Sequence, residues 1–358
     1  MIVAACRVLT PLLCFVCLGW AASPAHQDLP SDVTKLTLEE LMTLRVDLFS
    51  TGVMGTHTHH KGEWMVANQF TSMNLKGNRR GSQQVDVEDV LGRYPMAETG
   101  MFMSMTSVEV MHAPSDELSF TLMIPFIRKE MDQIQSGAMG GMGVSDPPVL
   151  FRTRSEGIGD VHLGSTMQVY KKGGVRLLAN ASLSLPTGSI DRWDQTPTGS
   201  RRLPYSMQLG SGTFDLLPGL ICLHERRDGV VGVSVGATTR LGENSNGYRL
   251  GDELHWAAWV ARKITGWFSV HLRLDGQSVG RLGGRDALLD TANTPAEDPD
   301  QQGGDRTDAL CGLDFYVPKG RFQKLRFTIE AGVPVYQRLN GTQLETDFTL
   351  GLRLQYVW

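Results

Sequence analysis

The last strand-like segment of the chain, residues 348–358, constrains the fold most. Apolar side chains recur there at every second position, and the segment ends on the aromatic Trp358. A period of two is the pattern of a β-strand with one face against an apolar environment. A terminal aromatic residue on such a strand is typical of outer-membrane barrels, where aromatic residues lie at the membrane interface. The apolar face comprises Phe348, Leu350, Leu352, Leu354, Tyr356 and Trp358.

The amino terminus has the layout of a secretory signal. Arg7 gives a short positive region, residues 8–20 are apolar, and Ser23-Pro24-Ala25 is a small-residue cleavage site. We therefore expect residues 1–25 to be removed. No later segment has the length and apolar character of a transmembrane helix, so contact with a membrane is expected to be made by strands.

Residues 26–62 differ in pattern from the rest of the chain. Apolar residues at helical spacing over 35–45 predict a short amphipathic helix. We expect 26–62 to be a periplasmic extension or partial plug, followed by a barrel over 63–358.

The connections between predicted strands alternate between short and long. Short connections rich in Gly, Pro or Asp follow every second strand, as at Pro114-Ser115-Asp116 and Arg227-Asp228-Gly229. Most of the others are long, such as 186–212 and 280–304. This alternation predicts a single antiparallel transmembrane β-barrel of about 12 strands with both termini in the periplasm. The predicted strands are 63–75, 100–113, 117–128, 157–171, 175–185, 213–226, 230–242, 251–264, 267–279, 305–317, 324–336 and 345–358.

Most predicted strands carry apolar residues on one face and polar residues on the other. In 267–279, Leu272 and Leu274 oppose Arg273 and Asp275. Lipid outside and a hydrated lumen inside explain this pattern. The lumen charges are either a salt-bridge network or a weakly selective polar path, and both interpretations stay open. The candidate lumen residues are Arg176, Arg273, Asp275, Arg326, Glu330 and Arg353.

Charge and cysteine usage exclude several classes of protein. The formal net charge is −4, without the basic stripe that nucleic-acid binding requires. Cys222 and Cys311 fall on predicted strands that are not neighbours, which argues against a disulfide. Outside the expected signal, no CxxC pair is present, and no cofactor is expected. The expected partners are outer-membrane lipid, a small-molecule solute and, through the strand ending in Trp358, the barrel-assembly machinery.

Three segments of the middle of the chain resemble a known family. They are SLSLPTGSID at 182–191, LPYSMQLGSGTFDLLPG at 203–219 and RLGENSNGYRLGD at 240–252. The chain resembles the outer-membrane transporter barrels grouped as the MetA-pathway of phenol degradation family. The resemblance implies a barrel in the outer membrane of a Gram-negative bacterium. It also implies passage of small molecules, including hydrophobic or aromatic compounds.

Histidine and methionine residues form the candidate metal site. Imidazoles close to thioethers bind copper-like ions, whereas the alternative is that Met fills gaps and the histidines are solvated. This set provides an alternative function in binding or export of such ions. Its members are His57, His59, His60, Glu63, Met101, Met103 and Met105.

An enzyme is not expected. Glu243-Asn244-Ser245-Asn246-Gly247 contains the Ser-Asn-Gly of barrel phospholipases, but Glu243 stands where those enzymes need a histidine base. The sequence therefore predicts a channel or transporter. A structural or adhesion barrel without transport is a further alternative.

Overall fold

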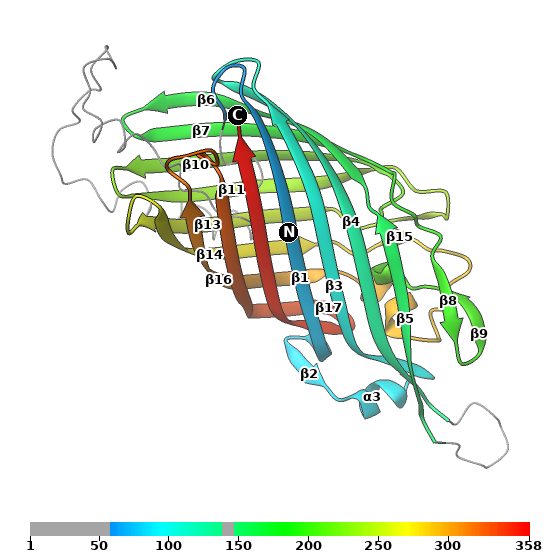
Figure 1. Cartoon of the computed structure of the whole chain (residues 1–358). Helices are drawn as coiled ribbons and strands as arrows, with labels where there is room; N and C mark the ends of the chain where they lie inside the picture. The colour runs from blue at the N-terminus through cyan, green and yellow to red at the C-terminus, as the bar shows by residue number, and fades with distance from the viewer. Residues whose placement is uncertain (1–57, 138–146) are drawn as a thin grey trace, which may run out of the picture. The chain divides into compact units, whose positions relative to one another are not determined.

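The computed structural model describes residues 58–137 and 147–358, which form one closed antiparallel sheet (Figure 1). Eleven elements make up the closed path, and pairing of β17 with β1 shuts it, with Met65 opposite Val357. The predicted signal, the 35–45 helix and His57 lie outside the described residues. In order along the chain, the elements are β1 (Trp64–Gly81), β3 (Met96–His112), β4 (Leu118–Gln135), β6 (Val161–Lys172), β7 (Val175–Leu185), β10 (Phe214–Arg226), β11 (Gly229–Leu241), β13 (Glu253–Lys263), β14 (Phe268–Val279), β16 (Gly304–Tyr316) and β17 (Arg326–Val357).

The element β17 is much longer than the others. Its first part, up to Leu339, pairs with β16, and its later part, from Leu339 to Val357, pairs with β1. The sequence predicts two strands here, separated by a connection at 337–344. The structure instead continues strand geometry through that connection, so one element spans both predictions.

Several strands extend further than their apolar pattern predicts. β1, β3 and β4 continue into the predicted loops 76–99 and 129–156. Two additional strands, β2 (Gln83–Val85) and β5 (Val149–Ile158), pair with β1 and with the far half of β4. The extension of β4 and the added strand β5 carry charged outward residues, which is why the apolar alternation does not reveal them.

The two ends of the barrel differ. One end, which we call the turn end, carries the short connections 113–117, 173–174, 227–228, 264–267 and 317–325. Trp64 and Trp358 also meet there, each backbone N–H donating to the other's carbonyl (3.0 Å both ways). The opposite end, the loop end, carries the long connections. Its small elements are α3 (Val87–Leu91), β8 (Trp193–Thr196), β9 (Gly199–Arg202), η2 (Tyr205–Met207), β12 (Tyr248–Arg249), β15 (Gly283–Gly284), η3 (Pro295–Glu297) and η4 (Pro299–Gln301).

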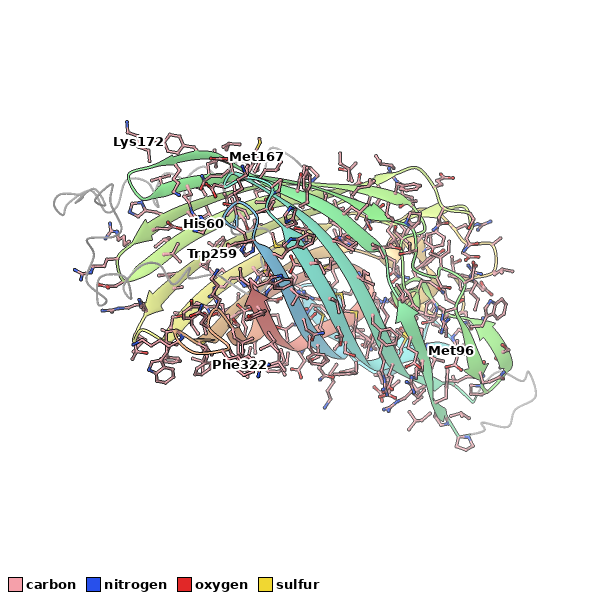
Figure 2. The ribbon with its side chains drawn as sticks, turned by 45° about the horizontal axis from the view of Figure 1, so that its top comes forward. His60, Met96, Met167, Lys172, Trp259 and Phe322 are labelled. Atoms are coloured by element: carbon pink, nitrogen blue, oxygen red, sulfur yellow. The ribbon has the colours of Figure 1, made fainter. Side chains whose placement is uncertain are left out.

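The predicted division into an apolar outer face and a polar inner face is present. On β14, Leu272 and Leu274 are exposed, whereas the alternate residues His271 and Arg273 are buried. Side chains project outward around the whole barrel (Figure 2). At the turn end, Trp267, Phe268 and Phe315 form an aromatic cluster with ring centroids 5.3–6.3 Å apart. Such a cluster matches the aromatic girdle of membrane barrels.

Part of the inner face is apolar, whereas the alternation on most strands predicts a polar, hydrated lumen. Leu178, Ile221, Leu223 and Trp259 are all buried and form one cluster across β7, β10 and β13. The indole of Trp259 lies against Gly232 of β11, where any Cβ would collide with the ring. A missing side chain on one strand therefore makes room for a large one on its neighbour.

No helix among the described residues is long and apolar enough to cross a membrane. Cys222 and Cys311 form no disulfide with each other, and their strands β10 and β16 do not pair.

Candidate functional site

The barrel encloses a cavity of about 600 Å³, which we call the lumen chamber. Its walls come from β1, β3, β4, β11, β13 and β14, and from loop-end segments that fold inward, among them 205–211. A volume of this size is typical of small-molecule sites.

One wall of the lumen chamber is apolar. On β4, Met123, Pro125 and Ile127 face inward at every second position, and Met105 of β3 lies directly opposite Ile127. The outward residues between them, such as Phe126, are exposed. Because side chains alternate along a strand, the same β4 segment presents one apolar row to lipid and another to the chamber.

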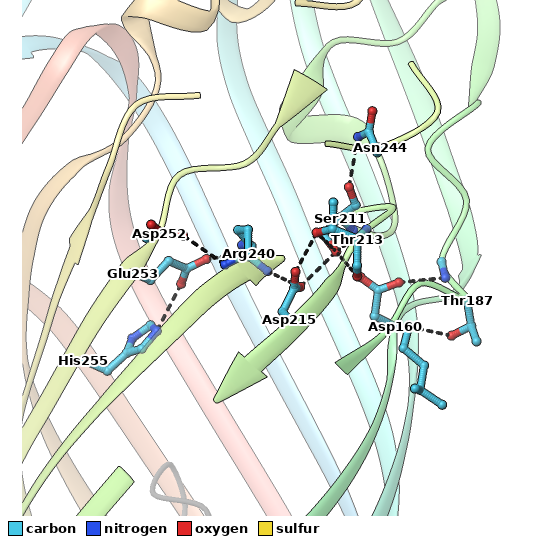
Figure 3. Close-up of polar contacts among 12 residues, drawn as sticks. Asp160, Thr187, Ser211, Thr213, Asp215, Arg240, Asn244, Asp252, Glu253 and His255 are labelled. Atoms are coloured by element: carbon cyan, nitrogen blue, oxygen red, sulfur yellow. Dashed lines mark hydrogen bonds and ion pairs between the residues drawn. The ribbon is translucent and has the colours of Figure 1, made fainter. Parts of the chain in front are cut away.

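The opposite wall carries a chain of charged side chains (Figure 3). Arg240 Nη1 lies 2.5 Å from Asp215 Oδ2, and Arg240 also pairs with Glu253. Glu253 in turn lies 3.1 Å from His255 Nε2. These groups come from three consecutive barrel strands, so each charge at this wall has an opposite charge beside it.

The inward loop 186–213 is fastened through two carboxylates, Asp160 just before β6 and Asp215 on β10 (Figure 3). Asp160 accepts from the backbone N–H groups of Gly188 (2.9 Å) and Ser211 (2.7 Å). Asp215 accepts from the hydroxyls of Ser211 (2.9 Å) and Thr213 (2.6 Å). The loop therefore forms a fixed boundary of the lumen chamber.

Lys129 holds the same loop from the other side. Its Nζ donates to the carbonyl oxygens of Ser206 (2.8 Å) and Gln208 (2.6 Å). It follows Ile127 in the inward row of β4 and lies opposite Met103 of β3. The sequence prediction ended this strand at residue 128 and so missed Lys129, although the alternation continues through it.

Packed loops close the loop end above the lumen chamber. The buried Arg202 lies 2.6 Å from Asp286 and 2.8 Å from Asp191. Tyr205 and Tyr248 pack edge to face, 4.9 Å between ring centroids. Burial raises the pKa of the Tyr248 phenol to about 12, so this hydroxyl is neutral at ordinary pH.

All six predicted lumen residues face the interior, and each has a polar partner there. Arg176 pairs with Glu225 (2.6 Å), and Arg353 pairs with Glu109 (2.6 Å). The other four lie on β14 and β17 and make their contacts at the wall formed by β14, β16 and β17. β13 separates this wall from Arg240 on β11. The four residues are Arg273, Asp275, Arg326 and Glu330. The pairs there are Arg273–Glu330 (2.8 Å), Arg273–Asp275 (3.2 Å) and Arg326–Asp314 (3.0 Å).

A buried histidine that the sequence prediction missed lies at the centre of that group. His271 Nδ1 is 2.9 Å from Asp314, and its Nε2 is 3.0 Å from Glu330. Its side chain is fully buried. The signal in the sequence was its place in the inward row of β14, two residues before Arg273. With both ring nitrogens on carboxylates, the imidazole acts as a bridge between β16 and β17.

Of the histidines and glutamate of the candidate metal set, His59, His60 and Glu63 are described, and they lie at the turn end. His59 is buried, with Nδ1 3.8 Å from Glu63, whereas His60 is exposed, 3.6 Å from Asp116. Glu63 itself accepts from Lys324 Nζ at 2.7 Å. Burial by itself would raise the pKa of Glu63, but the hydrogen bonds from Lys324 and the His60 backbone outweigh it and lower that pKa.

The methionines of that set lie elsewhere. Met101, Met103 and Met105 share the inward face of β3. In the same row, the methionine near the turn end is Met111, which lies opposite Met65 of β1. Ten residues of strand separate Met101 from Met111, or roughly 34 Å. The structure thus does not bring His59 or His60 together with these methionines. Among the described residues, no group of three or more His, Cys, Asp or Glu side chains is arranged to hold a metal ion.

The Ser-Asn-Gly segment is part of a tight turn. The Asn244 side chain accepts from the backbone N–H groups of Asn246 (3.0 Å) and Tyr248 (3.3 Å) and donates to the Ser211 carbonyl (3.0 Å). Asn244 therefore joins this turn to the inward loop.

No family model and no curated protein matches the chain. Solved structures do match. The COG4313 outer membrane channel from Pseudomonas putida F1 is 13% identical, covering 86% of this chain and 99% of that chain, with a TM-score of 0.57. The chain therefore shares the antiparallel β-barrel fold of that structure.

Two further matches have lower structural similarity. The TodX monoaromatic hydrocarbon channel (deltaS2 mutant) is 8% identical over 84% of this chain and 90% of that chain, with a TM-score of 0.46. The toluene transporter TbuX from Ralstonia pickettii is 10% identical over the same shares, with a TM-score of 0.42. At these scores neither structure contributes to the functional argument.

Proposed function

We propose that this chain is an outer-membrane channel through which small molecules pass, with the lumen chamber as its selective compartment. The observation that carries the proposal is a closed barrel whose outer face is apolar and whose interior holds a cavity of about 600 Å³. A channel needs an interior that binds solutes weakly enough to release them. A chamber with one apolar wall and one charge-paired wall meets that requirement.

The membrane placement belongs to the same proposal. We place the turn end in the periplasm and the loop end outside the cell, after cleavage of residues 1–25. β17 then counts as two strands, which gives the even number that an antiparallel barrel with both termini on one side needs. Membership of the MetA-pathway of phenol degradation family, passage of hydrophobic or aromatic compounds and the absence of enzymatic activity are likewise proposed.

Liposome swelling tests the channel proposal. The purified, refolded full chain is inserted into liposomes, and uptake of uncharged solutes of increasing size is measured. Heat-modifiable gel mobility verifies that the barrel is folded in every sample. Swelling that falls off with solute size supports a narrow channel, and a folded barrel that passes no solute contradicts it.

The copper-like alternative has one supporting observation, the methionine row on the inward face of β3. Copper titration of the wild type, of His57→Ala/His59→Ala/His60→Ala and of Met101→Leu/Met103→Leu/Met105→Leu tests it. Because the two halves of the set lie apart, we expect equal, weak binding in all three proteins. Loss of tight binding in either variant would favour the metal role instead.

A further inference from the structure

The inward row of β4 changes from apolar to cationic at the last residue that lines the lumen chamber. Met123, Pro125 and Ile127 are apolar, and Lys129 follows at the next inward position. The neighbouring residues on β3 opposite Ile127 and Lys129 are Met105 and Met103. The strip from Met123 to Lys129 is roughly 20 Å long. An ammonium group therefore terminates an apolar strip inside the cavity.

The Lys129 ammonium differs from the other cations near the lumen chamber. Arg240 pairs with Asp215, and Arg353 pairs with Glu109. In the part of the chain that the structure describes, no carboxylate lies within ion-pair distance of Lys129. Its two acceptors are loop carbonyls. An ammonium has three donors, and a buried cation is stabilised by an anion.

The acidic groups of the lumen chamber are already engaged. Glu109 is held by Arg353, and Glu253 by Arg240 and His255. Asp160 uses its two oxygens to accept backbone N–H groups of the inward loop. A cationic solute would have to displace one of these partners, whereas an anionic solute meets Lys129 without displacing a carboxylate.

We propose that the lumen chamber binds small organic monocarboxylates, with the apolar body on the Met123–Ile127 strip and the carboxylate on Lys129. The inference rests on the proposed channel function and names the class of solute. The carboxylate would accept the remaining N–H of Lys129 and would give the ammonium the anionic partner that it lacks.

Binding of three probes with the same ring tests the inference. Benzoate, benzyl alcohol and benzylamine are titrated calorimetrically into the purified, refolded full chain in non-ionic detergent. The test variant is Lys129→Met, which keeps the length of the side chain but removes its charge. The matched control is Arg128→Met, because Arg128 is the adjacent residue on the exposed outer face, paired with Glu130. Lys129→Arg retains the charge.

For the wild type we expect benzoate to bind more tightly than the other two probes. Lys129→Met weakens benzoate binding by at least ~10-fold while benzyl alcohol binding changes little. Arg128→Met has no such effect, and Lys129→Arg keeps the preference for benzoate. Equal benzoate affinity in Lys129→Met and wild type overturns the inference. A parallel loss of benzyl alcohol binding also overturns it, because the lysine would then act only by fastening the loop.

The channel proposal fails separately from this inference. If benzoate binding depends on Lys129 but no probe enters liposomes, the barrel has a carboxylate site and does not transport. Conversely, benzyl alcohol and benzoate could enter liposomes at equal rates that Lys129→Met does not change. If benzoate binding is also independent of Lys129, the protein is a channel without the carboxylate site.

Discussion

The guanidinium of Arg202 lies 2.6 Å from the carboxylate of Asp286, and both side chains are almost completely buried. Arg202 ends β9 in the inward connection between β7 and β10, and Asp286 belongs to the connection between β14 and β16. This ion pair joins the two longest fully described loop-end connections over the lumen chamber. The packing of these two connections against each other therefore depends on a contact between segments that are far apart in the sequence.

Removing Asp286 is expected to loosen the loop end. Asp286→Ala leaves the buried guanidinium of Arg202 with the exposed Asp191 as its remaining carboxylate partner, which costs about 1–3 kcal/mol of stability. The expected result is a higher single-channel conductance and a lower free energy of unfolding in urea. Asp300→Ala, in the same connection but exposed, provides the control. Unchanged conductance and stability in Asp286→Ala would show that the pair does not hold the loops.

Gly312 is predicted to be essential for the position of His271. A Cβ at Gly312 would collide with the imidazole that bridges Asp314 and Glu330. Gly312→Ala should therefore lower the free energy of unfolding by about 1–3 kcal/mol. Gly351→Ala on β17 is the matched control, because a Cβ added at Gly351 would lie 3.9 Å from its nearest neighbouring atom. Equal stability of the two variants would contradict this account of the His271 site.

The stability of the turn end should depend on pH through Glu63. Its folded pKa lies below the ordinary value of 4.5, so its ionised form stabilises the fold at neutral pH. That contribution is lost as pH falls below about 4.5 and through the folded pKa. The difference in unfolding free energy between wild type and Glu63→Gln should be constant above pH ~5 and shrink below it. A difference between wild type and Glu63→Gln that stays the same from pH ~7 to pH ~3 would contradict this account.

Neutralising Glu109 is expected to change ion selectivity. Glu109→Gln leaves Arg353 without its carboxylate partner in the wall of the lumen chamber. The interior then gains one uncompensated positive charge, and the reversal potential under a salt gradient should shift toward anions. Asp228→Asn, which removes one negative charge at an exposed turn, controls for total charge. The same shift in both variants would mean that Glu109 does not act from the interior.

The barrel itself could be predicted from the sequence because lipid on one side and a polar interior on the other impose a period of two. β7, β10, β11, β13 and β14 begin and end within two residues of their predicted limits. The prediction was less accurate where the outer face is no longer apolar. Beyond Phe126, the outward residues of β4 are Arg128, Glu130 and Asp132. The strand continues there without the signal that reveals it.

The site was less predictable than the fold. The alternation placed Arg273 and Arg353 on the inner face, but it does not specify which carboxylate each one meets across strands. The lumen chamber depends on the inward course of 205–211 and on contacts such as Lys129 with Ser206 and Gln208. Those contacts join residues more than 70 positions apart. Within the candidate metal set, His59 and His60 lie away from Met101 and Met103, because residue type and order in the sequence do not specify proximity in space. A metal-binding role stays a prediction.

Planar-bilayer recording tests the central claim most directly. The purified, refolded full chain, shown to be folded by heat-modifiable mobility, is added to a bilayer in symmetric salt. A channel with a narrowed lumen chamber predicts small, discrete conductance steps that increase in Asp286→Ala. A folded, inserted barrel that gives no conductance, in wild type and in Asp286→Ala alike, would contradict the claim that this protein is a channel.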